Sequence, residues 1–327
     1  MNSDEIRKQS ENAYNQWAVK WREHCRAHSK FEMHPMNDLL MSGIGKTILC
    51  VANGYSFEED IDIIRENQKD LDIMCCDKTL GSCIDNGVVP KYCMVCDAVV
   101  DHERYLKPWE DKLEGVTLLM NACGNPNWAE NGNWKKIYFF VSRDILNSEE
   151  EFCKISGCPN KIPAGTNVSN AMVVILTQCD ESGSRNFFGY DKILLTGFDY
   201  CWGHSKYYAF DGLAGGKNNY MRHIYTANRR DEVCFTSNNL MFSARWLHKY
   251  VEVYKIPVVQ CSGCSLLTLP HTGDLKDHIG YTYKPSDYNI IIEAVKKKEE
   301  LMNEIKKINC IMKETTRDHL NSFLASV

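Results

Sequence analysis

The stretch SGIGKTILCVANGYS, residues 42–56, decides the fold class because it places a short apolar run between two glycine turns. The run TILCVA, residues 47–52, has the length of a strand and lacks polar alternation, which suits a sheet buried on both faces. The turn NGYS, residues 53–56, follows it and leads into the acidic stretch FEEDIDII. Strand, glycine turn and helix in this order predict the first unit of a parallel α/β sheet.

Similar apolar runs recur along the chain and alternate with helical patterns. Further strands are predicted at residues 71–77, 92–99, 116–122, 136–142, 192–199 and 256–262. Helices are predicted at residues 56–68, 167–180 and 236–254. This alternation predicts an α/β fold with a doubly wound, mostly parallel, Rossmann-like sheet.

Helices are also expected at both ends of the chain. Residues 3–28 carry Tyr14, Trp17, Trp21 and Cys25 on one stripe, which predicts a helix packed on the core, with a partner-binding helix as the alternative. The charged tail from residue 286 to 323 has apolar residues near heptad positions, so it either lies across the domain or self-associates, making a homo-oligomer. We expect three parts: an N-terminal helical segment 1–42, an α/β domain 43–283 and a C-terminal long helix 284–327.

The composition excludes several classes of protein. The 327 residues are 44% hydrophobic, enough for a large core, and the formal net charge of −5 gives no general cationic field for nucleic acid. No apolar run approaches the ~18 residues of a membrane helix, and the polar start is unlike a secretory signal. We therefore expect no nucleic-acid partner, no membrane span and a cytoplasmic location.

The cysteines point to a reduced protein. Sixteen are scattered through apolar stretches, which is typical of thiols that serve as small core residues. The two CxxC pairs, Cys93/Cys96 and Cys261/Cys264, lie too far apart in sequence for a zinc ribbon.

Only one of the two glycine turns has the order that phosphate binding requires. In a P-loop the strand comes before the glycines, whereas here it follows GIGKT, and Leu40 stands where the first glycine should be. We interpret GIGKT as a turn into the strand, with Lys46 in solvent. In the second turn Gly54 can adopt a conformation denied to other residues, and Ser56 can cap the helix while its amide faces an anion.

Acidic residues stand at the ends of three predicted strands. Asp77 ends one strand, Asp97 the next and Asp199 a later one, with His204 close behind. Carboxylates at the carboxyl edge of a sheet can hold Mg²⁺ or a ribose, and a histidine there can take a proton from a hydroxyl. The alternative is that these aspartates only cap turns.

Four segments together resemble a known family. VANGYSF resembles its G-[NA]-G-P-S-L segment, and CCDKTLGSCIDNGVVPKYCMVCD, AGTNVSNAMVVILTQ with GYDKILLTGFDYCWGHSKYY, and VVQCSGCSLLTLPHTGDL resemble later ones, in order over residues 47–275. The family includes the archaeal 6-hydroxymethyl-dihydropterin diphosphokinases and the motility-associated flagellin glycosyltransferases. The chain departs from its pattern at Tyr55, where proline is usual, at Phe198, where glutamine is usual, and at Cys261, where asparagine is usual.

The resemblance implies a nucleotide-binding α/β core related to that of the bacterial sialyltransferases, which use a CMP-activated sugar. It places Asp199 and His204 near the reacting centre. Carried over to this chain, the residues that bind the nucleotide or line the cleft are Asn53, Gly54, Ser56, Asp77, Asp97, Gly165, Thr166 and Asn167.

Three hypotheses follow. The first is transfer of a nonulosonic-acid-type sugar from a CMP-activated or other nucleotide donor to a hydroxyl of a protein or glycan, with His204 as base and Tyr207 or Tyr208 donating to the leaving phosphate. The second is Mg²⁺-dependent diphosphoryl transfer from ATP to a hydroxymethylpterin-like alcohol, with Asp77, Asp97 and Asp199 around the metal. The third is a non-catalytic nucleotide- or glycan-binding module.

One aromatic segment has two interpretations. Trp128 and Trp134 in NPNWAENGNWKKIYFF predict a surface loop, and the alternative is that they stack on a sugar or pterin ring.

Overall fold

The computed structural model describes residues 3–143, 146–163, 165–178, 187–202, 208–210, 224–228 and 230–279. Residues 1–280 form one compact unit, and residues 281–327 form a second. The second unit, with the predicted helix 286–323, lies outside the described residues, as do His204 and Tyr207.

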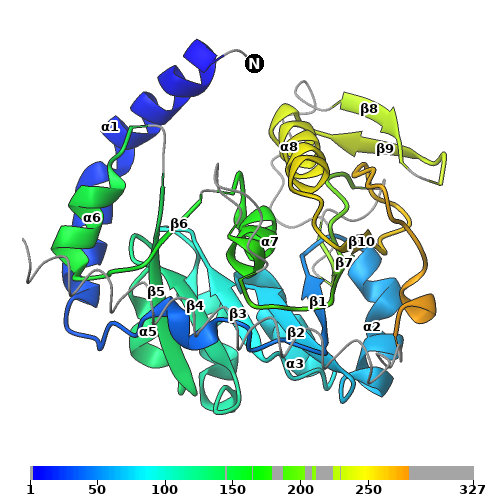
Figure 1. Ribbon diagram of the computed structural model, residues 1–327, viewed down its shortest axis with the longest axis horizontal. Coiled ribbons are helices and arrows are strands. Elements are labelled where there is room, and N and C mark those ends of the chain that lie inside the picture. Colours follow the sequence, from blue (N-terminus) through cyan, green and yellow to red (C-terminus); the bar gives the residue numbers. More distant parts are fainter. Residues whose placement is uncertain are drawn as a thin grey trace, which may run out of the picture. The chain divides into compact units, whose positions relative to one another are not determined.

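A parallel sheet of eight strands forms the centre of the first unit (Figure 1). In order across the sheet the strands are β10 (Val258–Gln260), β7 (Lys192–Thr196), β1 (Thr47–Val51), β2 (Leu71–Cys76), β3 (Tyr92–Val95), β4 (Thr117–Asn121), β5 (Lys136–Ser142) and β6 (Lys161–Ile162). The seven predicted strands are confirmed, and only the two-residue β6 was not predicted. The chain runs outward from β1 to β6 and returns to β7 beside β1, so the strand order reverses between β1 and β7.

Helices connect the strands, and a small hairpin precedes the last described α-helix. The helices are α1 (Ser3–His28), α2 (Ser56–Asn67), α3 (Leu80–Asp85), α4 (His102–Tyr105), α5 (Asn127–Asn131), α6 (Glu149–Ser156), α7 (Val168–Thr177) and α8 (Asn238–Tyr254). Short 3₁₀ helices are η1 (Met36–Leu39), η2 (Asp77–Thr79), η3 (Lys107–Lys112) and η5 (Leu275–Asp277). The antiparallel hairpin of β8 (Ile224–Ala227) and β9 (Val233–Thr236) was not predicted and lies beside α8 (Figure 1).

The sheet is covered on both faces, which is why its strands are almost wholly apolar. Side chains alternate along β1, so Ile48 and Cys50 face one core cluster with α7 and α8, while Leu49 and Val51 face the other. The second cluster also contains Phe57 of α2 and residues of α3, α5 and α6. Two covered faces confirm the doubly wound arrangement.

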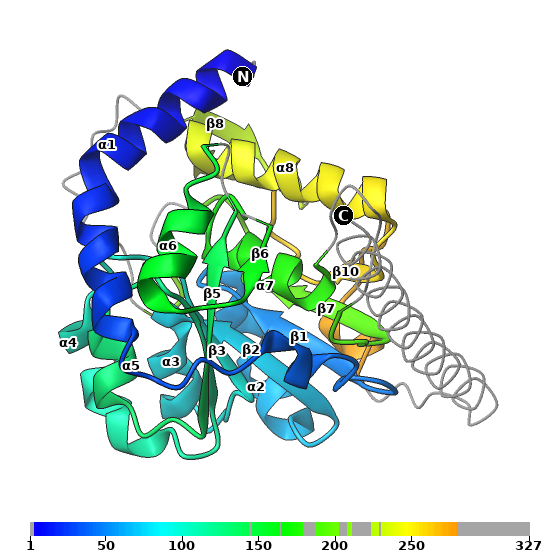
Figure 2. The same ribbon diagram turned by 60° about the vertical axis from the view of Figure 1, so that its left-hand side comes forward.

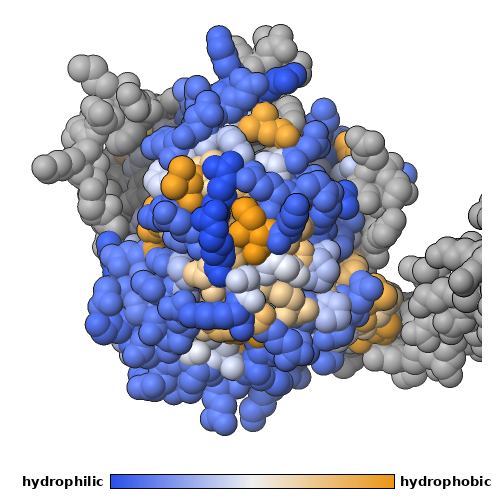
Figure 3. All heavy atoms as spheres, turned by 90° about the vertical axis from the view of Figure 1, so that its left-hand side faces the viewer, coloured by the Kyte–Doolittle hydropathy of each residue, from blue (hydrophilic) through white to orange (hydrophobic). Residues whose placement is uncertain are grey.

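Helix α1 packs on α6, and Figure 2 shows the two side by side. Arg22 donates to Glu151 at 2.5 Å, Tyr14 donates to the same carboxylate at 2.8 Å, and Cys25 is fully buried. The predicted apolar stripe therefore does face the core. On the outer face that carries α1 and α6, hydrophilic residues dominate, and hydrophobic ones lie in small separate groups (Figure 3).

The GIGKT segment is a turn that enters β1, as predicted. Gly43 donates its amide to Phe188 O at 2.7 Å, and Gly45 has a φ of 73°, which favours glycine. Lys46 Nζ lies 4.0 Å from Asp72 Oδ2 at the amino end of β2. This loop is therefore at the opposite edge of the sheet from the strands' carboxyl ends.

Other sequence expectations meet different outcomes. Trp128 is fully buried and stacks with Trp134 at 6.5 Å between ring centroids, so both the surface-loop and the ligand-stacking interpretations are wrong for Trp128. The cause is that α5 turns this indole into the core below β4 and β5.

All described cysteines have free thiols, and all but Cys96 and Cys153 are buried. Within the described part of the chain, no helix has both the length and the apolar character needed to cross a bilayer.

Candidate functional site

A pocket of about 570 Å³ lies at the carboxyl ends of the strands, beside the point where the strand order reverses. Six strands, β1, β2, β3, β4, β5 and β7, each lead directly into residues that line it. In an open α/β sheet this is where ligands bind. The predicted residues that line the pocket are Asn53, Gly54, Asp77, Asp97, Gly165, Asn167, Asp199 and Tyr208.

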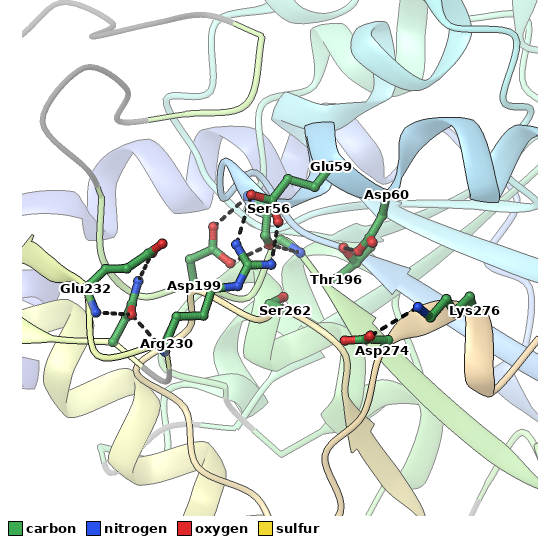
Figure 4. Close-up of polar contacts among 12 residues, drawn as sticks. Ser56, Glu59, Asp60, Thr196, Asp199, Arg230, Glu232, Ser262, Asp274 and Lys276 are labelled. Atoms are coloured by element: carbon green, nitrogen blue, oxygen red, sulfur yellow. Dashed lines mark hydrogen bonds and ion pairs between the residues drawn. The ribbon is translucent and has the colours of Figure 1, made fainter.

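Asp199 occupies the amino end of α2. Its Oδ2 accepts the backbone amide of Ser56 at 2.9 Å, and its Oδ1 accepts the Ser56 hydroxyl at 2.5 Å (Figure 4). The prediction that the Ser56 amide faces a ligand anion is therefore wrong, because an internal carboxylate already holds that position. Ser56 itself is buried and does not line the pocket.

Gly54 is required for space and not for an unusual backbone conformation. Its φ lies outside the left-handed region, which corrects the sequence interpretation. A Cβ at this position would lie 2.5 Å from both Asp199 Oδ2 and Gly197 O. The Gly54 amide donates to that same Gly197 carbonyl at 2.9 Å, so the turn after β1 is pressed against the turn after β7.

The outer side of this junction is closed by further polar contacts. Arg230 forms a two-pronged ion pair with Glu59 of α2, at 3.1 and 2.8 Å, and Asp60 accepts the Thr196 hydroxyl at 2.5 Å (Figure 4). Helix α2 is therefore bound to β7 and to the segment after β8. Its first turn serves the fold, and ligand contacts must come from other parts of the pocket.

Asp77 is a buried carboxylate that lines the pocket. It is 2% exposed, and its Oδ1 accepts the backbone amide of Lys78 at 2.7 Å. Burial raises the pKa of Asp77 to about 6, the nearby Asp97 also raises it, and Lys78 opposes the rise. Asp77 can therefore exchange a proton near neutral pH, which suits acid or base catalysis.

Asp97 and Asp199 differ from Asp77 in their surroundings. Asp97 is exposed and lines the pocket. Its Oδ1 accepts the Val99 amide at 2.9 Å, a hydrogen bond that stabilises the turn after β3. Burial raises the pKa of Asp199 to about 6 although the hydrogen bonds from Ser56 oppose this. Among the described residues, no three His, Cys, Asp or Glu side chains are grouped so that they could hold one metal ion.

Lys78 is a pocket residue that the sequence analysis missed. Its Nζ lies 5.3 Å from the centroid of the Tyr208 ring and 5.9 Å from that of Tyr105. Burial alone would lower the pKa of Lys78, but Tyr208, Asp77 and Tyr105 raise it above its usual value. The only signal in the sequence was its place directly after Asp77 at the end of a strand.

Contacts of the two residues after Tyr208 hold this tyrosine at the pocket. Ala209 donates its amide to Asn53 O at 3.1 Å, the Phe210 amide donates to Glu58, and the Phe210 ring meets Phe57 edge-on at 5.5 Å. The Asn53 Oδ1 atom is buried and has no hydrogen-bond partner among the described residues. A buried amide oxygen that lines a pocket in this way suits a ligand donor.

The turn before α7 supplies another wall. Asn167 caps α7 by accepting the Asn170 amide at 2.8 Å, and a Cβ at Gly165 would lie 2.6 Å from Ala171 N. The Thr166 hydroxyl instead accepts Asn170 Nδ2 at 2.6 Å, and Thr166 does not line the pocket. Gly165 and Asn167 therefore reach the predicted position, and Thr166 does not.

The part of the pocket near β4 and β5 was not predicted. Asn121 Nδ2 donates to Ser142 Oγ at 3.2 Å, and Trp21 of α1 meets Phe152 edge-on at 5.9 Å between ring centroids. With Arg143, these residues give this end of the pocket a cation, hydroxyl and amide groups, and aromatic rings. The helical spacing of Trp21 revealed a buried stripe but not its place beside a pocket.

Comparison with known proteins agrees with this architecture. The structure of the MAf glycosyltransferase from Magnetospirillum magneticum AMB-1 is similar over 85% of this chain, with a TM-score of 0.58 and 13% sequence identity. The chain spans 41% of that structure's length, and at this identity the likeness shows a shared fold. No curated protein sequence matches the chain. A family profile described as 6-hydroxymethylpterin diphosphokinase MptE-like matches residues 23–205, more than half of the chain. The family resemblance seen in the sequence is thereby confirmed, and this chain belongs to the MptE-like family.

Proposed function

We propose that this chain is a nucleotide-dependent transferase that moves a sugar from a nucleotide-activated donor to a hydroxyl acceptor. The observation that carries the proposal is the pocket at the reversal of strand order, in which the titratable carboxylate of Asp77 adjoins the cation of Lys78. A volume of about 570 Å³ is in the range of pockets that bury a small molecule. A CMP-activated nonulosonic acid is the proposed donor, by extension from the family resemblance.

The reaction requires two groups from the protein. The acceptor oxygen bonds to the anomeric carbon while its proton passes to a base, and the bond from that carbon to the phosphate oxygen breaks with its electron pair on the leaving nucleotide. Asp77 fits the base because burial brings its pKa to about 6, and His204 is the base proposed from the sequence. Tyr208 is proposed to donate a hydrogen bond to the departing phosphate, the role also proposed for Tyr207.

A second function is favoured by one observation, the pair Asp77 and Asp97 at neighbouring strand ends. Two carboxylates suit Mg²⁺, which is commonly held by one or two carboxylates together with substrate phosphates. In such a diphosphokinase the alcohol oxygen would attack the β-phosphorus of ATP, and AMP would leave. Bound Mg²⁺ would neutralise phosphate charge. Asp199 fits this role less well because both of its oxygens accept hydrogen bonds from Ser56.

A thermal-unfolding panel with CMP, CDP, UDP, GDP and ATP, each with Mg²⁺ or with EDTA, tests the proposal. A ligand at a hundred times its dissociation constant stabilises a protein by about 2.7 kcal/mol. We expect the largest increase in Tm from a cytidine nucleotide, with or without Mg²⁺. Stabilisation by ATP alone and only with Mg²⁺ would favour the diphosphokinase. No increase with any nucleotide would contradict both functions.

Turnover assays separate an enzyme from a binding module. Asp77→Asn and His204→Ala should each bind the nucleotide that the wild type binds, and the variant that lacks the base should lose about 10²- to 10⁴-fold in turnover. Nucleotide binding by the wild type without turnover of any donor would instead support the non-catalytic module.

A further inference from the structure

We propose that Lys78 is the phosphate anchor of the pocket and takes the place of a divalent metal there. This inference rests on the proposed function, because it names the group that receives the donor's phosphate. Lys78 is half-buried and lines the pocket, it directly follows Asp77 in the chain, and its Nζ lies 5.3 Å from the centroid of the Tyr208 ring.

The backbone around Lys78 is fixed by its neighbours. Lys78 lies in η2, where the Thr79 hydroxyl accepts the Cys76 amide at 3.1 Å and lies 3.2 Å from the Val51 carbonyl of β1, to which it can donate. The Lys78 amide itself donates to Asp77. The side chain therefore starts from a rigid point between the ends of β1 and β2, which is what a binding cation needs to be positioned in advance.

The usual phosphate site of this kind of fold is already filled. In related α/β folds the amides of the first strand-to-helix turn receive the phosphate. Here the Gly54 amide donates to Gly197 O, and the Ser56 amide donates to Asp199. A phosphate beside this turn would also meet the negative charge of ionised Asp199. The anion must therefore be held elsewhere in the pocket.

Lys78 and Arg143 are the cations among the described residues that line the pocket, and they belong to different ends of it. Lys78 follows β2, next to the reversal of strand order, whereas Arg143 follows β5, three strands away. Only Lys78 adjoins Asp77, the carboxylate proposed to act as base. A phosphate near the reacting centre therefore falls to Lys78.

The tyrosine contacts orient the ammonium without neutralising it. Tyr208 accepts a hydrogen bond from Lys78, and the rings of Tyr208 and Tyr105 lie within cation–π distance of its Nζ. An ammonium has three N–H donors, so it can serve Tyr208 and a phosphate together. Its charge also opposes the binding of Mg²⁺ at Asp77 and Asp97, so phosphate binding should not need a metal.

Calorimetric titration with three probes tests the inference: inorganic pyrophosphate, CMP and cytidine, all in EDTA. We expect Lys78→Met to weaken pyrophosphate and CMP by about 10- to 100-fold, the equivalent of one charged hydrogen bond, and cytidine by less than about twofold. Lys78→Arg keeps the charge and should retain most of the pyrophosphate affinity. Lys46→Met is the matched control, since Lys46 lies at the opposite edge of the sheet, and it should bind all three probes as the wild type does.

The outcomes separate this inference from the proposed function. If the wild type binds CMP and Lys78→Met binds it equally well, or loses cytidine to the same extent, Lys78 is not the anchor and the transferase proposal stands. If the wild type binds pyrophosphate through Lys78 but binds no nucleotide, the anchor stands and the proposed donor class is wrong. Binding by the wild type that EDTA abolishes overturns the inference without any variant, as does a wild type that binds no probe.

Discussion

The two ends of strand β2 each carry an aspartate near lysines, but they are built differently. At the amino end, Asp72 Oδ2 accepts from Lys91 Nζ at 2.6 Å and from the Tyr190 hydroxyl at 2.7 Å, with Lys46 at 4.0 Å. These groups satisfy one another. The cluster joins β1, β2, β3 and the segment before β7, and its role is structural.

At the carboxyl end, Asp77 is more deeply buried, and its Oδ1 accepts the backbone amide of Lys78. The Lys78 ammonium lies against two tyrosine rings, and Asp97 stands exposed on the same pocket. Burial raises the pKa of Asp77 to about 6. The buried ionised carboxylate therefore lowers the stability of the fold, a cost that an ion pair would offset. Titratable groups that line a pocket with perturbed pKa values, and that lower the stability of the fold, are typical of a functional site.

The largest difference between the two ends of β2 should appear in the turnover of variants. Asp77→Asn removes a proton acceptor from the pocket, and we expect turnover of the donor to fall by about 10²- to 10⁴-fold. Asp72→Asn, on the same strand, should leave turnover within about twofold. Steady-state kinetics with the donor found in the nucleotide panel makes this comparison, and equal turnover by Asp77→Asn and the wild type would remove Asp77 from the reaction.

The free energy of unfolding should change in the opposite direction: Asp77→Asn should raise it and Asp72→Asn should lower it. The effect of Asp77→Asn should also depend on pH. The folded pKa of Asp77, about 6, lies above its unfolded value near 3.8, so its contribution to stability is present below about pH 4 and is lost as pH rises through about 6. At pH 7.5 we expect Asp77→Asn to unfold with a free energy up to about 3 kcal/mol higher than that of the wild type. Asp72→Asn, which weakens two hydrogen bonds, should lower it by about 1–3 kcal/mol. Urea denaturation at pH 5 and 7.5 should show that the stability advantage of Asp77→Asn over the wild type is smaller at the lower pH, and a less stable Asp77→Asn at pH 7.5 would contradict this prediction.

The turn after β1 should tolerate almost no added atom. Gly54→Ala places a Cβ against Gly197 O and the Asp199 carboxylate, and we expect a loss of about 1–3 kcal/mol in the free energy of unfolding. Gly115→Ala is the control, because a Cβ there meets nothing within 4 Å. Thermal denaturation of both variants is the measurement. Equal stability of the two would mean that the turns after β1 and β7 are not in contact.

The smallest effect belongs to the lysine of the P-loop look-alike. Lys46 is half-exposed and 4.0 Å from a carboxylate that has closer partners, so Lys46→Met should change the free energy of unfolding by no more than about 0.5 kcal/mol. It should also leave nucleotide affinity unchanged. A nucleotide dissociation constant that rises tenfold in Lys46→Met would move the phosphate site to the amino edge of the sheet.

Much of the fold could be predicted because burial on both faces leaves a strong pattern in sequence. The seven longer strands are short apolar runs, and their order along the chain indicated the doubly wound sheet. The two-residue β6 and the hairpin of β8 and β9 are too short, or too mixed in composition, to give a periodic signal.

The site could be predicted only in part. Asp77, Asp97 and Asp199 were found because parallel strands end at one edge of a sheet. The use of Asp199 by Ser56 depends on a contact between residues 143 positions apart, which no local pattern reports. Lys78 and Trp21 were missed as site residues for the same reason: their neighbours in space, Tyr208 and Phe152, come from distant segments.

Hydrogen exchange of the wild-type chain with and without saturating CMP tests the central claim most directly. We predict slower exchange of amides in residues 76–79 and 96–99, at the carboxyl ends of β2 and β3, and unchanged exchange in residues 42–47. Slower exchange in 42–47 with no change in 76–79 would show that the ligand binds at the amino edge, and would contradict the account.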